Sequence, residues 1–382
     1  MKTKLPIYAL CFVNLIYLVP SVAVSGLVAA FPGVPEQRLL LLLTIPNLAG
    51  IAGILGVPVL TRWCSRRDLS AAAMALFLLG GGMSLVFHGC LPVLLLGSAV
   101  MGVAYGVNSA VYPLLVSMYY RGEERSRVSG VASGMLQLGR VSVVLVGGVL
   151  ADLCWYSVYL LFALTAVPLA LALAWLPKDL PAAGEQSGAG VTDGWDRAAL
   201  VRLCAIGFAF AVCYYVNVTH TSLYIEGGGF GTAAVTGAVT AAASVLSGLL
   251  AICFGPIYRR TGRYTFALAL AIMGGTYVLA GLWVNLATAV LAVCGAAVGI
   301  ALFSPCLMLE MAGAAPQRTL PAATALVLTI VNVGYFLSPV LVGTASGLTA
   351  GSTPAEQFLT GGVLALLITA ACLLLERRSG TK

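Results

Sequence analysis

Long apolar runs separated by short polar segments dominate the chain. Stretches of about 20 apolar residues match the thickness of a bilayer's hydrocarbon core when they are helical. Strands of a membrane barrel would instead alternate polar and apolar residues over about ten positions. The continuous runs therefore predict an all-α polytopic membrane protein with twelve transmembrane helices. The predicted spans are 5–31, 38–61, 69–88, 91–119, 127–152, 155–176, 200–225, 232–257, 264–284, 287–310, 319–346 and 357–375.

The first apolar run follows two lysines, Lys2 and Lys4, as in a secretory signal peptide. The apolar part of a signal peptide is only 7–15 residues long, roughly, and a small-residue cleavage site follows it. The run here continues to about residue 31 and further spans come after it. We therefore interpret it as a retained first helix.

One connection is longer and more polar than the others. Residues 177–199 are rich in Gly and charged side chains and divide the predicted spans into two groups of six. The pattern predicts an N-terminal six-helix bundle over 1–176, a cytoplasmic linker over 177–199 and a C-terminal six-helix bundle over 200–382.

The basic residues indicate how the helices cross the membrane. Lys and Arg collect in the short cytoplasmic loops of membrane proteins. With the N-terminus inside and twelve spans, 18 of the 20 basic residues fall on the inner side. Arg38 alone falls outside, and Arg140 lies within a span. We expect a multi-pass protein of the cell membrane with both termini cytoplasmic.

Composition agrees with a lipid environment. The chain is 60% hydrophobic and 9% charged with a mean hydropathy of +1.01, whereas soluble domains carry roughly 25% charged residues. The net charge of +7 is explained by topology and does not indicate a nucleic-acid partner. The ten cysteines form no C-x-x-C pair. Cys90 and Cys154 are both expected at outer helix ends, so a bridge between them stays open.

The two halves repeat in sequence. The second span is followed by Val57-Pro58-Val59-Leu60-Thr61-Arg62-Trp63-Cys64-Ser65-Arg66-Arg67, and the eighth is followed by Gly255-Pro256-Ile257-Tyr258-Arg259-Arg260-Thr261-Gly262-Arg263. A second repeated segment aligns Gln137-Leu138-Gly139-Arg140 with Asn332-Val333-Gly334-Tyr335, 195 positions later. Two six-helix repeats of the same orientation are one design for alternating access.

These loops resemble the signature of the major facilitator superfamily, Gly-x-x-x-Asp-(Arg/Lys)-x-Gly-(Arg/Lys)-(Arg/Lys). Helix count, linker and repeat extend the resemblance over the whole chain. It implies two pseudo-symmetric six-helix bundles and loops that latch the cytoplasmic side. Thr61 and Arg259 stand where the family has its aspartate, so a standard charge-based latch is in doubt. The gating-loop candidates are Arg62, Arg66, Gly255, Arg259, Gly262 and Arg263.

Arg140 is the main candidate for binding substrate. It lies 13 residues after Arg127 and 12 before Asp152, which places it about 18–20 Å along the helix from either end. A charge at that depth costs at least roughly 2.5–3.5 kcal/mol, so it faces a wet cavity or a partner. Arginine suits carboxylates and similar oxyanions. The alternative is an arginine satisfied by helix carbonyls and Gln137.

Other polar residues recur on single helical faces, and by the resemblance the first, fourth, seventh and tenth helices line the cavity with help from the fifth and eleventh. Such residues also hydrogen-bond between helices with no substrate role. His220 is a candidate proton shuttle or a hydrogen-bonding residue. The further substrate-binding candidates are Gln137, Asn108, Tyr105, Tyr112, Asn14, Tyr17, Tyr214, Asn217, Asn332 and Tyr335.

Among function classes, a secondary transporter explains the repeat, linker and polar stripe. An enzyme would need paired carboxylates, a metal constellation or an activated nucleophile, and a transporter-like receptor usually carries an added soluble domain. The sequence indicates no cofactor, no metal and no ATP-binding loop. We expect a monomer that moves a small organic anion or amphoteric metabolite, with any coupled ion left open. A proton-coupled multidrug or sugar exporter is the alternative.

Overall fold

A computed structural model describes residues 3–178, 195–316, 319–349 and 353–379. Every regular element in these ranges is helical, and twelve helical segments in them are long and apolar enough to cross a membrane. The predicted fold class and number of spans are thus confirmed. The chain divides into two compact units, 1–187 and 188–382. Most of the predicted linker, residues 179–194, lies outside the described residues.

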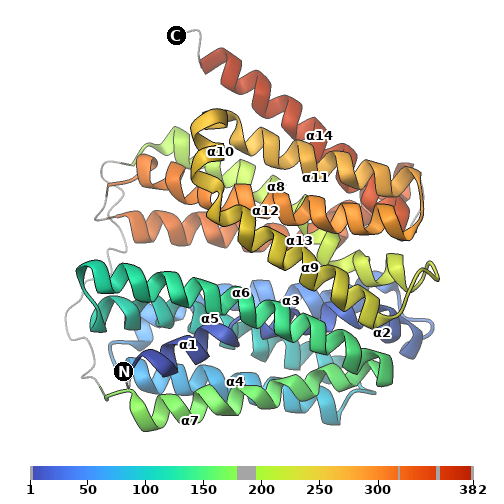
Figure 1. Ribbon diagram of the computed structural model, residues 1–382. Helices are drawn as coiled ribbons and strands as arrows, with labels where there is room; N and C mark the ends of the chain where they lie inside the picture. Colours follow the sequence, from blue (N-terminus) through green and yellow to red (C-terminus); the bar gives the residue numbers. More distant parts are fainter. Residues whose placement is uncertain (1–2, 179–194, 317–318, 350–352, 380–382) are drawn as a thin grey trace. The chain divides into compact units, whose positions relative to one another are not determined.

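Unit 1 is built from helical segments (Figure 1). They are α1 (Lys4–Phe12), η1 (Ile16–Val22), α2 (Val24–Ala30), α3 (Glu36–Leu60), α4 (Arg66–Val86), α5 (Leu91–Tyr119), α6 (Gly122–Leu153), η2 (Trp155–Thr165) and α7 (Ala166–Trp175). Here η denotes a 3₁₀ helix. The core lies between α4, α5 and η2, where Phe77, Tyr159 and Phe162 are almost completely buried.

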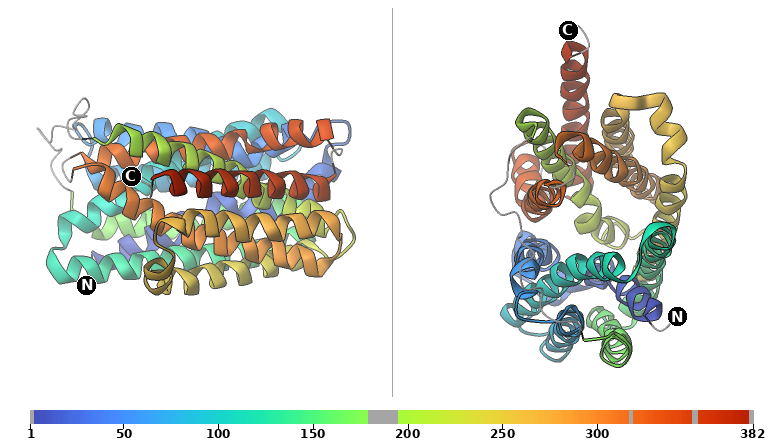
Figure 2. Two further views of the ribbon diagram at one scale, coloured as in Figure 1. Left: turned by 90° about the horizontal axis from the view of Figure 1, so that it is seen from above. Right: turned by 90° about the vertical axis from the view of Figure 1, so that its left-hand side faces the viewer.

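Unit 2 is also built from helical segments, and its long helices run roughly along one direction (Figure 2). They are α8 (Arg197–Ile225), α9 (Ala233–Ile252), α10 (Phe254–Thr261), η3 (Gly262–Tyr264), α11 (Thr265–Leu282), α12 (Leu286–Ala314), α13 (Leu320–Thr349) and α14 (Pro354–Ser379). Its core includes Phe210 and Phe303, whose rings stack with centroids 3.8 Å apart.

Both units pair their helices in the same pattern. In unit 1, α5 packs on α3 and α4, α6 packs on α1, and α4 packs on η2 and α7. In unit 2, the corresponding helices make the same pairs: α12 with α9 and α11, α13 with α8, and α11 with α14. The repeat recognised in the sequence is therefore a repeat of topology.

The second repeated segment, around Gly139 and Gly334, lies where two helix backbones come close together in each unit. A Cβ on Gly139 of α6 would overlap the backbone of Phe12 in α1. A Cβ on Gly334 of α13 would lie 2.9 Å from the carbonyl oxygen of Phe208 in α8. Glycine is needed at both positions because it lets two helix backbones come together.

Three predicted spans differ in detail from the structure. The first, predicted over 5–31, is broken after Phe12 and continues as η1 and α2. The sixth begins with the 3₁₀ helix η2, and the eighth ends at Ile252, with α10 following as a separate helix. Hydropathy reports only the length of an apolar run and does not distinguish α from 3₁₀ geometry. Cys90 and Cys154 are both free thiols in the structure.

Candidate functional site

A buried amide cluster lies where the first span of unit 1 is broken. Asn108 of α5 donates from Nδ2 to Asn14 Oδ1 at 2.8 Å and to the carbonyl oxygen of Leu10 at 3.0 Å. Ser109 donates from Oγ to Asn14 Oδ1 at 3.3 Å, and Asn14 Nδ2 lies 3.2 Å from the same hydroxyl. The cluster thus joins α5 to the end of α1.

The local backbone explains how Asn14 reaches this position. The amide of Asn14 bonds to the carbonyl of Cys11 at 3.2 Å, and that of Ile16 bonds to Val13 at 3.1 Å. These three-residue steps replace the α-helical pattern at the break. Asn14 and Asn108 are 3% and 0% exposed, so their amides must bond inside the protein. Asn108 Oδ1 is the exception: it is buried without a hydrogen-bond partner among the described residues.

Two tyrosines extend this cluster toward α3. The rings of Tyr17 and Tyr105 are 4.4 Å apart between centroids, and the Tyr17 hydroxyl donates to Asn47 Oδ1 at 3.4 Å. Asn47 was missed by the sequence analysis, although an amide in the middle of an apolar run is the signal that singled out Asn14. Tyr112 is half-buried on α5, one turn beyond Asn108.

Arg140 occupies the central position of its span. The span covers Arg127–Leu153, so Arg140 lies about 20 Å from either end. Arg140 and Gln137 are half-buried. Its neighbour Gly139 touches Phe12, two residues before Asn14. Arg140 therefore lies on a helix that packs against α1, and the amide cluster joins α5 to the end of α1.

The substrate-binding candidates in unit 2 are a group of neighbouring tyrosines and two amides that each hydrogen-bond within their own helix. Tyr335 of α13 lies 6.1 Å from Tyr214 and 5.1 Å from Tyr215 between ring centroids. Asn332 donates to the carbonyl of Leu328 at 2.8 Å, within its own helix. Asn217 accepts from the Thr221 hydroxyl at 3.1 Å, also within one helix. Each of these two side-chain amides thus bonds within its own helix, whereas Asn14 and Asn108 bond between segments.

His220 lies among buried residues of α8. Its side chain is 2% exposed, and Nδ1 lies 2.7 Å from the hydroxyl of the adjacent Thr219. This neighbour satisfies one ring nitrogen. The arrangement matches the hydrogen-bonding interpretation of His220 more closely than that of a solvent-connected shuttle.

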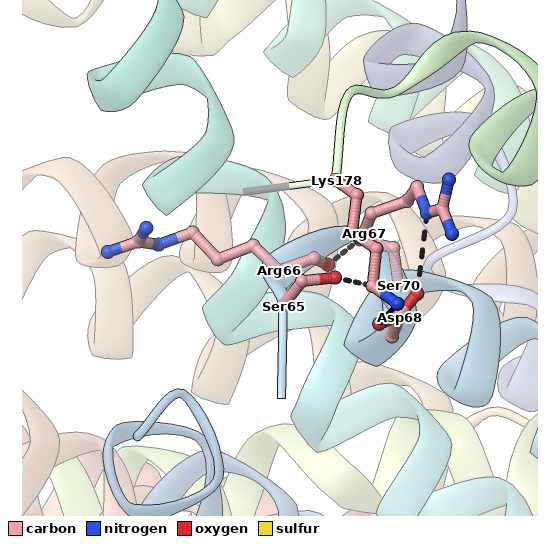
Figure 3. A network of polar contacts seen from close by, with 6 residues as sticks. All are labelled: Ser65, Arg66, Arg67, Asp68, Ser70 and Lys178. Carbon is pink, nitrogen blue, oxygen red and sulfur yellow. Dashed lines mark hydrogen bonds and ion pairs between the residues drawn. The ribbon is translucent and has the colours of Figure 1, made fainter. Parts of the chain in front are cut away.

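The first gating loop contains an acidic residue that its signature did not reveal (Figure 3). Asp68 lies one residue beyond the loop motif; its carboxylate is 3.3 Å from Arg67 Nε and 4.0 Å from Lys178 Nζ. Its backbone amide donates to Ser65 Oγ at 3.1 Å, which caps α4. The sequence signal is the capping pattern Ser-x-x-Asp. No local pattern reveals Lys178, because it is far away in the chain.

The two arginine candidates in this loop lie differently. Arg66 is half-buried and directs Nη1 toward Met118 Sδ of α5 at 3.3 Å, whereas Arg62 is exposed. Arg66 is thus the better placed of the two to connect the loop with the end of α5. In Figure 3 the Arg66 side chain points away from the group formed by Arg67, Asp68 and Lys178.

The second gating loop has a different backbone from the first. Gly262 has φ of +49°, a region that favours glycine, whereas Cys64 at the matching position has a negative φ. Gly255 and Arg259 are both exposed, and the side chain of Arg263 lies outside the described residues. The two loops therefore follow different paths despite their matching sequence positions.

A second acidic group lies near the end of α12. Glu310 of α12 accepts from the Tyr258 hydroxyl at 3.2 Å and lies 3.6 Å from an Arg202 Nη. Partial burial, together with the negative charge of Glu310, raises the pKa of Tyr258. Each unit thus has a carboxylate paired with a basic residue, although neither stands in the family's aspartate position.

Among the described side chains, no three His, Cys, Asp or Glu residues lie close enough together to hold a metal ion. Twelve apolar spans in two repeated bundles, with polar side chains at mid-span, are the architecture of a membrane transporter. The chain belongs to the Major Facilitator Superfamily, whose model matches residues 7–339. It is a multi-pass membrane protein that transports a small solute, and it is not an enzyme.

Solved transporters share this fold at low sequence identity. A POT family transporter in complex with a thioalcohol-conjugated peptide is 14% identical, with a TM-score of 0.77 over 98% of this chain and 96% of that chain. A D-xylose-proton symporter is 16% identical, with a TM-score of 0.74 over 97% and 96%. The nucleoside transporter NupG, as a mutant, is 14% identical, with a TM-score of 0.75 over 97% and 99%. No curated protein matches the chain in sequence.

Proposed function

We propose that the chain moves a small organic anion or amphoteric metabolite by alternating access between its halves, 1–176 and 200–382. Arg140 carries the proposal, because it is a permanent cation at the centre of a membrane span. Every Asp and Glu in the sequence lies near a span end or in a loop. A guanidinium binds a substrate carboxylate through two parallel hydrogen bonds.

The amide cluster suggests how such a substrate is oriented. Asn108 Oδ1 is a buried acceptor without a hydrogen-bond partner among the described residues. A substrate ammonium or hydroxyl group supplies the donor that it lacks. Tyr17, Tyr105 and Tyr112 offer contact area within unit 1, and Tyr214 and Tyr335 are the tyrosine candidates within unit 2. An amphoteric metabolite thus matches both the cation and the free acceptor.

Proton-coupled export of a drug or sugar is the alternative. Glu226, at the end of α8, accepts from the hydroxyls of Ser222 at 2.6 Å and Thr236 at 3.0 Å. It is half-buried and therefore offers a carboxylate for a proton. Glu226→Gln would abolish proton-driven transport in this alternative. In the organic-anion proposal it leaves exchange driven by substrate alone unchanged.

We further propose that the chain is a monomer in the cell membrane with both termini cytoplasmic. The distribution of Lys and Arg supports this orientation. Exposed cysteines test it: Cys90 is expected outside and Cys253 inside. In single-cysteine variants, an impermeant maleimide should label Cys90 in intact cells and Cys253 only after permeabilisation. The reverse labelling would refute the orientation.

Binding tests the substrate class directly. Purified wild type and Arg140→Ala would be screened by thermal shift against carboxylates, neutral compounds and cations. We expect carboxylates to stabilise the wild type and to lose this effect in the variant. Arg121→Ala, an exposed arginine at the start of α6, is the matched control and should respond as the wild type does. Binding of neutral or cationic compounds alone, unaffected by Arg140→Ala, would overturn the proposal.

A further inference from the structure

A cavity of about 390 Å³ opens on unit 2 between the start of α11 and the end of α14. The two helices pack side by side. The cavity lies at the boundary of both spans, because one begins at Thr265 and the other ends at Leu373. Its volume falls within the range of roughly 300–1,000 Å³ that suits small-molecule ligands.

The end of the cavity outside the spans is polar and cationic. Arg260, Thr261 and Tyr264 line it, and all three precede the first residue of the α11 span. The Thr261 hydroxyl is already bonded to the carbonyl of Ile257 at 3.0 Å. Arg260 is exposed and therefore supplies the charge that a ligand would meet there.

The remainder of the cavity is apolar and lies within the membrane spans. Ala267, Leu268 and Ala271 of α11 and Leu373 of α14 form its wall. Thr369 also lines it, but its hydroxyl donates to the carbonyl of Ala365 at 2.8 Å. That side chain therefore presents its methyl group or a satisfied hydroxyl to the cavity.

We propose that this cavity binds an anionic phospholipid. The phosphate would pair with Arg260, Tyr264 would lie at headgroup level, and an acyl chain would run along Ala267, Ala271 and Leu373. Three features select this ligand: the cation at the span boundary, a set of described lining residues that includes no acid, and apolar walls at the depth of lipid tails. Tyrosine is favoured at the membrane interface, and basic pockets between helices on the cytoplasmic side bind anionic headgroups.

Native mass spectrometry of the full chain in detergent tests this site. The probes are phosphatidylglycerol and phosphatidylcholine with identical acyl chains. We expect tighter binding of phosphatidylglycerol by the wild type, and Arg260→Gln should weaken it about fivefold, as expected for one basic residue near a membrane surface. Arg259→Gln is the matched control, because Arg259 is exposed on the same helix but does not line the cavity.

A second pair of variants tests the apolar part of the proposed site, which would hold the acyl chain, separately from the charge of Arg260. Ala271→Phe fills the cavity and should weaken binding of phosphatidylglycerol, whereas Ala370→Phe, at an exposed position of α14 outside the lining, should not. Equal loss in Arg259→Gln and Arg260→Gln, equal binding of both lipids, or full binding by Ala271→Phe would each overturn the proposal. Displacement of the lipid by inorganic phosphate alone would show a free-phosphate site instead and would also overturn it.

Discussion

Asn14 and Asn108 bond to each other across two helices although they are 94 residues apart in the chain. Inside a membrane the backbone has no water to bond with, so a side-chain donor that reaches the Leu10 carbonyl stabilises the broken end of α1. Asn108 performs this role and also fixes Asn14. The same pair therefore holds the helix break and borders the proposed substrate site.

Replacing Asn108 should show how much this link contributes. Asn108→Ala removes the donor to both Leu10 and Asn14, and we expect a loss of about 1 kcal/mol, since hydrogen bonds between membrane helices contribute about 0.6–1.7 kcal/mol. Thermal unfolding in detergent measures it. Ser117→Ala, which removes an exposed hydroxyl bonded within α5, is the control. Equal melting of the two variants would contradict the account.

An ion pair at the membrane boundary predicts a pH dependence. Lys4 Nζ lies 2.8 Å from Glu124 Oε1, and this hydrogen bond lowers the pKa of Glu124. A lowered pKa in the folded state stabilises the fold above the carboxyl's unfolded pKa of about 4.3, and this contribution is lost as pH falls through the folded-state value.

Glu124→Gln tests the direction of this pH dependence. At neutral pH and low salt the variant should melt below the wild type, and the difference should disappear as the solution is acidified below the Glu124 pKa or as salt is added. Glu123→Gln, the exposed neighbour, should melt as the wild type does at every pH. A difference that grows on acidification would refute the assignment.

Individual residues were predictable where a polar side chain interrupts an apolar run. Asn14, Asn108 and Arg140 are conspicuous for this reason, and the structure places them on the turn after α1, on α5 and on α6. Asp68 and Glu310 are less conspicuous in the sequence because they lie near helix ends, where charges are common. Their partners Lys178 and Arg202 come from distant segments, so only tertiary structure identifies the pairs.

At the scale of elements, glycine contacts set how closely helices approach. Gly139 lets α6 meet α1, and Gly334 lets α13 meet α8. Both contacts adjoin the candidate site residues Arg140 and Tyr335. The position of each candidate is therefore coupled to the backbone contact one residue before it.

Replacing Gly139 or Gly334 with alanine should push apart the two helices that meet at that glycine. We expect Gly139→Ala and Gly334→Ala to lose roughly 1–3 kcal/mol, the range for overpacked cores, and to weaken substrate binding. Gly134→Ala and Gly347→Ala are matched controls on the same two helices, because a Cβ there meets nothing within 4 Å. These should be neutral or stabilising, since alanine favours helix by about 1 kcal/mol. Unchanged melting of Gly139→Ala would contradict the close-contact account.

The spans themselves were largely predictable, and the irregular ones were not. The span predicted over 91–119 is the α5 span to the residue, because short polar loops mark its ends. The turn after Phe12, residues 13–15, carries neither Gly nor Pro, the usual signals of an interrupted helix, and Pro20 lies further on, inside η1. Asn108 and Gly139, which contact the chain at this break, lie far away in the sequence.

At the scale of the whole molecule, the repeat of topology and the family assignment establish a transporter. In the function proposed above, its mid-span cation selects the substrate class. A mid-span arginine adds a cost to insertion, and in this proposal an anionic substrate offsets that cost when it binds. Transport should therefore depend on the charge at residue 140 and not merely on the bulk of its side chain.

Exchange of a radiolabelled carboxylate, chosen from the thermal-shift screen, into proteoliposomes loaded with the same compound tests this claim most directly. We predict uptake by the wild type and Arg121→Ala, reduced uptake by Arg140→Lys, which keeps the charge without the planar fork, and none by Arg140→Ala. Uptake by Arg140→Ala at the wild-type rate would show that Arg140 is structural, and the organic-anion account would be wrong.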